Sequence, residues 1–116
     1  MTDPMPIRDA ATVIVLDRNA SGGPSVLMGQ RGAQAAFMPS KYVFPGGAVD
    51  PEDAGVRFAM PLDARARRLL AAEPRDGAPI TPEALAAAAL RELAEETGLM
   101  TGTPGPAPQG WDHYAR

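Results

Sequence analysis

The chain has 116 residues, a formal net charge of −3 and a hydrophobic content of 45%, which suits one globular domain with a modest core. It has no cysteine, which excludes disulfides, thiol nucleophiles and zinc–thiolate sites. The lone histidine, His113, excludes a multi-histidine metal site within one chain. The acidic balance argues against nucleic-acid binding, and no apolar run is long enough to span a membrane. We therefore expect a cytoplasmic protein with no nucleic-acid or membrane partner.

Three extended segments are predicted in the first half of the chain. Residues 11–17 are β-branched and apolar, and residues 26–31 follow after a glycine-rich turn, so the two should form a hairpin. Residues 41–44 form a third short strand that Pro45 ends. The next two residues, Gly46 and Gly47, allow a sharp turn and a close approach of the backbone to a ligand.

Residues 51–80 differ in composition and are interpreted as a segment inserted between the strands and the next helix. They mix proline and charge, and they hold one short predicted helix over 62–72. Arg65, Arg67 and Arg68 lie on that helix, where a solvated face is the simplest interpretation of three basic residues.

The best-defined element is a helix from Glu83 to Glu96, which is rich in strong helix formers. Thr81 is a suitable N-cap, Pro82 suits the first helical position, and Gly98 suits the C-terminal end. Beyond a proline- and glycine-rich stretch, residues 111–116 are predicted to begin another strand.

Three glutamates, Glu92, Glu95 and Glu96, share one face of this helix and span about 100° of its circumference. Each like-charge pair costs only about 0.2–0.5 kcal/mol, so a merely solvated acidic face is tolerable. Carboxylates fixed in this way are also hard oxygen ligands for Mg²⁺ or Mn²⁺, which commonly bind substrate phosphates as well. Bound cations would relieve the repulsion, so a metal site explains the cluster.

The stretch "RELAEETGL", residues 91–99, resembles the second half of the Nudix box, G-x5-E-x7-R-E-U-x-E-E-x-G-U, where U is a bulky aliphatic residue. "VFPGG", residues 43–47, resembles the strand and glycine turn that lead into the box. The resemblance implies an α/β fold, an α/β/α sandwich around a mixed sheet. It implies metal-dependent hydrolysis of a diphosphate that links a nucleoside to another group. It makes Glu92, Glu95 and Glu96 candidate ligands of Mg²⁺ or Mn²⁺ and makes Arg91 the residue that orients a glutamate.

The first half of the box is matched less directly. Gly77 and Glu83 fit by count, but Gly77 does not follow a strand, and nine residues at about 100° each place Glu83 on the opposite helix face from Glu92. We therefore expect Glu83 to stabilise the helix start. Gly46 or Gly47 is then the structural glycine, followed by an insertion of 30 residues relative to the box.

An inserted loop of this kind is typical of the Nudix subgroup that acts on coenzyme A and related compounds. In that subgroup's pattern, L-L-T-x-R-[ST]-x3-R-x3-G-x3-F-P-G-G, Arg31 falls on the first arginine. Ala36 replaces the second arginine and Ser40 the glycine. Arg31, Gly46 and Gly47 are candidate substrate contacts, the expected partner is a small nucleotide diphosphate, and a second copy of the chain is left open as a partner.

We expect residues 1–116 to form a single Nudix domain that holds only the N-terminal part of the fold, because Nudix proteins have further strands and a second helix. A working hydrolase is the leading hypothesis. A binding or regulatory module of the same fold, or a silent fragment, is the alternative.

Overall fold

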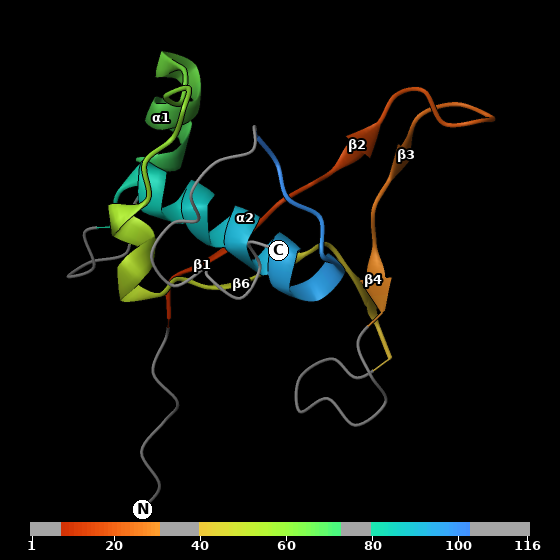
Figure 1. Ribbon diagram of the computed structural model, residues 1–116, viewed down its shortest axis with the longest axis horizontal. Coiled ribbons are helices and arrows are strands. Elements are labelled where there is room, and N and C mark those ends of the chain that lie inside the picture. The colour runs from red at the N-terminus through yellow and green to blue at the C-terminus, as the bar shows by residue number, and fades with distance from the viewer. Residues whose placement is uncertain (1–7, 31–39, 73–79, 103–116) are drawn as a thin grey trace, which may run out of the picture.

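The computed structural model describes residues 8–30, 40–72 and 80–102 (Figure 1). Strands and helices follow one another as an α/β fold, which confirms the predicted class. Three extended segments each carry two short strands, which are β1 (Ala10–Thr12) and β2 (Leu16–Asp17), β3 (Ser25–Val26) and β4 (Gly29–Gln30), and β5 (Tyr42–Val43) and β6 (Gly46–Ala48). Arg31, Gly77, His113 and residues 111–116 lie outside the described residues.

Each extended segment divides its pairing between the other two. β1 pairs with β6, β2 with β3, and β4 with β5, always antiparallel. The predicted hairpin is confirmed, with Leu16 opposite Val26. Because each segment changes partner midway, the described strands form three two-stranded sheets, and the parallel pairs of a mixed sheet are not among them.

The expected turn at Gly46 and Gly47 is wrong, because both glycines lie within β6. Gly46 pairs with Thr12 and Gly47 with Ala11. β5 ends at Val43, before Pro45, and the carbonyl of Pro45 accepts a hydrogen bond from Val13 at 2.9 Å, so the chain continues directly into the next ladder.

Helix α2 (Pro82–Thr97) packs on β1 and β6. Thr81 caps its start by accepting a hydrogen bond from Ala84 at 3.1 Å, and Gly98 ends it with a left-handed φ of 78°, both as predicted. Apart from Pro82 and Arg91, the buried side chains of the helix are mostly small: Ala84, Ala87, Ala88, Ala89, Leu93 and Ala94. A helix with such a face lies close to the strands beneath it, which fixes the height of its glutamates above β6.

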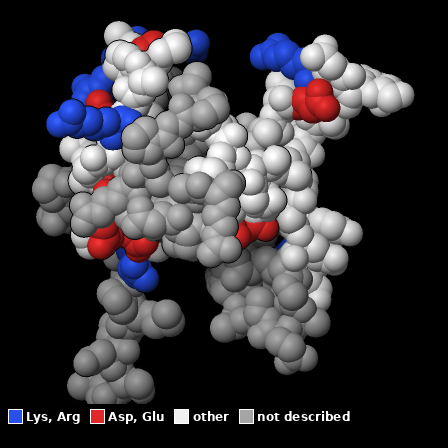
Figure 2. All heavy atoms as spheres, in the orientation of Figure 1, with Lys and Arg blue, Asp and Glu red and all other residues white. Residues whose placement is uncertain are grey.

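The segment before α2 contains a 3-10 helix, η1 (Pro51–Gly55), and helix α1 (Ala64–Leu70). The second confirms the predicted short helix in shorter form, and basic side chains gather over it in Figure 2. Arg67 of α1 donates to Glu83 at 2.6 Å, which ties α1 to the first turn of α2. No helix in the described part of the chain is long and apolar enough to cross a membrane.

Candidate functional site

Arg91 lies at the centre of the candidate site and is only 6% exposed. Its Nη1 donates to the Oε1 atoms of Glu95 at 2.9 Å and Glu92 at 3.2 Å. Its Nη2 donates to the backbone carbonyl of Ala48 at 2.9 Å. The arginine therefore holds two of the three predicted glutamates to one guanidinium and ties them to the end of β6.

Asp53 is the partner of Arg91 that sequence reasoning missed. Its side chain is fully buried. The carboxylate accepts hydrogen bonds from Nε of Arg91 at 3.0 Å and from Nη2 at 3.2 Å, which makes a bidentate ion pair. It also accepts the backbone N–H of Asp50 at 2.7 Å. The pair raises the pKa of Arg91, because the charged guanidinium is stabilised by this carboxylate more than burial disfavours it.

A spacing signal for Asp53 was present in the sequence. Five residues separate Gly47 from Asp53, which is the G-x5-E spacing of the box with aspartate in place of glutamate. Between Asp53 and Arg91 there are 37 residues, where the box has seven. On this count the extra residues follow Asp53, and η1 belongs with α2, against which it packs.

Glu92 is the least exposed of the three glutamates, and its pKa is raised. The chief cause is burial, followed by the negative charge of Glu95, while Arg91 acts in the opposite direction. Ionising the Glu92 carboxyl therefore costs free energy, and a cation bound nearby would lower that cost.

Gly46 and Gly47 bring the strand backbone against its neighbours, so the expected close approach is directed at the protein itself. A Cβ on Gly47 would overlap the carboxylate of Glu92, with Oε1 at 2.6 Å. A Cβ on Gly46 would meet the Cα of Thr12 at 2.8 Å and the carbonyl of Ala11. Glycine at 47 thus leaves room for Glu92 to lie over β6.

We expect Gly46→Ala to lower the free energy of unfolding by about 1–3 kcal/mol, because the new methyl group meets backbone atoms that cannot yield. Urea unfolding followed by circular dichroism measures the change. Gly29→Ala is the matched control, because its Cβ would meet only the carbonyl of Val43 at 3.9 Å, and it should shift stability by less than about 1 kcal/mol. Equal losses in the two variants would contradict the steric argument.

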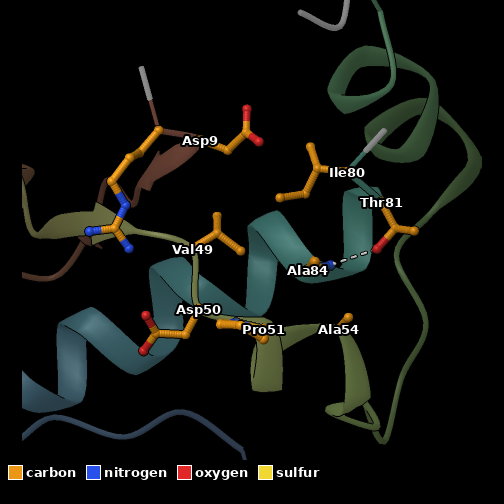
Figure 3. Close-up of a pocket in the computed structure, with 9 residues that line it drawn as sticks. Asp9, Val49, Asp50, Pro51, Ala54, Ile80, Thr81 and Ala84 are labelled. Atoms are coloured by element: carbon orange, nitrogen blue, oxygen red, sulfur yellow. Dashed lines mark hydrogen bonds between the residues drawn. The ribbon is translucent and has the colours of Figure 1, made fainter. Parts of the chain in front are cut away.

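Glu96 opens on a hollow of about 520 Å³ between the strands and the end of α2. Residues of the strand segments and of the end of α2 line the hollow, including Thr12, Gln30, Phe44, Gly46, Gly47 and Thr97. A second hollow of about 390 Å³ lies at the other end of α2, beside Thr81, Ile80 and Val49 (Figure 3). Only the first contains a predicted site glutamate.

The structure thus brings together Arg91, Glu92 and Glu95 directly, and Glu96 with the two glycines around one hollow. In the described part of the chain, no three acidic or histidine side chains are arranged as a metal-holding group. The donor chemistry still fits a hard divalent cation, because the three side chains offer only carboxylate oxygens and Glu92 is ionised at a cost. Glu83 is paired with Arg67 instead.

The position of the subgroup pattern's glycine has a distinctive backbone. Ser40 has a φ of 62°, in the left-handed region that favours glycine, and its carbonyl accepts a hydrogen bond from Gln30 Nε2 at 3.1 Å. The chain therefore keeps a glycine-like backbone where the pattern has glycine, although the residue is serine.

Among solved structures, this chain is similar to a NUDIX hydrolase from Alicyclobacillus acidocaldarius. The two share 33% identity with a TM-score of 0.60, over 95% of this chain and 48% of that one. The chain belongs to the Nudix hydrolase family. It spans about half the length of this Nudix neighbour. Neither a model of a known protein family nor a curated protein matches it.

Proposed function

We propose that this Nudix chain carries the metal-binding side of a hydrolase that cleaves a diphosphate linkage between a nucleoside and another group. The observation that carries the proposal is the joint placement of Arg91, Glu92 and Glu95, with Glu96 opening on the adjacent hollow. In the proposed reaction a water attacks one phosphorus of the diphosphate bridge, and the leaving group departs as a phosphate ester.

Glu92, Glu95 and Glu96 are the residues proposed to hold Mg²⁺ or Mn²⁺. When bound, the cation would neutralise charge that develops on the phosphoryl oxygens. Arg91 acts on this site by orientation: its guanidinium fixes the carboxylates of Glu92 and Glu95 relative to β6. Gly46 and Gly47 line the same hollow as Glu96, and glycine at 47 leaves room for the carboxylate of Glu92 over β6.

We propose a nucleotide diphosphate of the coenzyme A type as the substrate class, in a cytoplasmic setting. The left-handed backbone at Ser40 supports this choice, because that conformation favours glycine, which the subgroup pattern has at this position. Arg31 remains a proposed phosphate contact. The alternative is a binding module of the same fold, which would take up metal and nucleotide without turnover.

A metal titration tests the proposed ligands. Mn²⁺ or Mg²⁺ should raise the melting temperature of the chain, because a ligand that binds only the folded state stabilises it. The double change Glu95→Gln and Glu96→Gln should abolish that rise. Glu52→Gln and Glu83→Gln together, on the same chain but away from the hollow, should leave it unchanged. A metal response that persists in the first double variant would remove these glutamates from the metal site.

A further inference from the structure

Tyr42 is an aromatic residue of β5 whose side chain lies mostly in solvent, with 69% of the residue exposed. The other aromatic side chains in the described part of the chain, those of Phe44 and Phe58, are half-buried. A single exposed aromatic residue needs no explanation on its own, because such residues are normal on protein surfaces. The informative feature of Tyr42 is its position beside the hollow that contains Glu96.

Strand pairing places Tyr42 at the edge of this hollow. Tyr42 lies directly opposite Gln30 in the β4–β5 ladder, and opposite residues of an antiparallel pair project to the same face. Gln30 lines the hollow, and so does Val43, the next residue along the strand. The wall of the hollow therefore meets Tyr42 both across the ladder and along the chain.

The side chain of Gln30 is fixed beside Tyr42 on this face. Its Nε2 donates to the carbonyl of Ser40, two residues before Tyr42, at 3.1 Å. This bond uses one of the two N–H groups of the amide, so the side chain can still donate one hydrogen bond and accept others. A flat ring with an amide next to it matches the two features of a nucleobase, which has a π-face for stacking and a polar edge for hydrogen bonds.

The hollow extends from this edge to the glutamate end of the site. Glu96, Gly46 and Gly47 line its other part, where β6 meets the end of α2. Four residues of extended chain separate Tyr42 from Gly46, which is at most about 13 Å. That length suits the sugar and diphosphate of a nucleotide between a base at Tyr42 and a cation at the glutamates.

We propose that Tyr42 is a substrate-binding residue whose ring stacks on the nucleobase of the nucleotide diphosphate. The inference rests on the proposed function, because it takes the diphosphate to lie at Glu92, Glu95 and Glu96. Every base has a π-face, so stacking on Tyr42 selects nucleotides over sugar phosphates without choosing strongly among the bases.

Calorimetric titration of the chain with AMP in the presence of Mg²⁺ tests the contact. Tyr42→Ala should weaken AMP binding at least about tenfold, whereas Tyr42→Phe should bind like the parent because it keeps the ring. Ribose 5-phosphate has the same sugar and phosphate without the base, so the parent and Tyr42→Ala should bind it equally. Leu16→Ala, which removes an exposed apolar side chain from β2, should leave AMP binding unchanged. Equal AMP affinity in the parent and Tyr42→Ala, or no AMP binding by the parent, would overturn the proposal.

A fluorescence measurement shows whether the ring at this position is open to a ligand. Tyr42→Trp combined with Trp111→Phe leaves residue 42 as the only tryptophan of the chain. Its emission should be that of a water-exposed indole and should be quenched as AMP is added. The emission of a buried indole that AMP does not change would refute the proposal, because another part of the protein would then cover the ring.

The stacking contact and the metal site can fail separately. The rise in melting temperature with Mn²⁺ does not involve Tyr42. If that rise is present while the AMP tests fail, the stacking contact is wrong and the proposed metal site stands. If AMP stacks on residue 42 but the chain has no Mn²⁺ response, the metal site is wrong and the base contact stands.

Discussion

Asp53→Ala should lower the free energy of unfolding by about 3–5 kcal/mol, one of the two largest effects that the structure predicts. The substitution leaves the buried guanidinium of Arg91 without the carboxylate that receives both Nε and Nη2. Removing one partner of a buried ion pair costs more than the pair is worth, because the remaining charge stays desolvated. Urea unfolding at neutral pH gives the value directly.

Asp50→Ala is the matched control for Asp53→Ala. Asp50 also faces Arg91, at 3.4 Å, but its side chain is 44% exposed, so water screens the interaction. Its loss should cost less than about 1 kcal/mol. If the two alanine variants lost equal stability, the buried pair would not be what anchors α2 to η1.

The second large effect concerns turnover. If the proposed hydrolase activity is present, Glu96→Gln should lower the rate of diphosphate hydrolysis at least about a hundredfold, which is roughly 2.7 kcal/mol of barrier. Glutamine keeps the size of the side chain and removes the charge that the proposed cation needs. The assay is Mg²⁺-dependent release of phosphate products from coenzyme A and other nucleotide diphosphates.

Glu83→Gln is the control that shows whether losing any negative charge from α2 lowers the rate. Glu83 lies on the same helix but is paired with Arg67, so its change should leave the rate within a few-fold of the parent. A loss comparable with that of Glu96→Gln would show that the Gly77–Glu83 match to the box is functional. Metal and nucleotide binding without any turnover would favour the binding-module alternative.

Local signals made α2 predictable from sequence. Thr81, Pro82 and Gly98 each specify a helix end through a short-range interaction, and the glutamate spacing follows from helix geometry alone. The short strands were less predictable, because the change of partner within each extended segment depends on contacts between residues far apart in the chain. Gly46 and Gly47 illustrate this, since glycine permits both a turn and the close strand packing that occurs here.

Asp53 marks the limit of sequence reasoning for the site. Its spacing from Gly47 was readable, but the 37 residues before Arg91 concealed that the two belong together. Burial of the pair depends on η1 folding back onto α2, and an exposed and a buried aspartate look the same in sequence. The exposure of Ile14 and Leu16 was missed for the same reason, because an apolar strand over residues 11–17 predicts burial without saying on how many sides.

The segment between η1 and α2 is held by ion pairs at both of its ends, and this affects how well the chain tolerates changes in the segment's length. The segment leaves the site at η1, which Arg91 holds, and returns at the capped start of α2, which Glu83 joins to α1. With both ends fixed, closing a longer or shorter loop between them changes the free energy slowly, by about 0.6 kcal/mol for each doubling of length. Adding or removing residues in this segment should therefore change the stability of the chain little and leave the contacts of Arg91 in place.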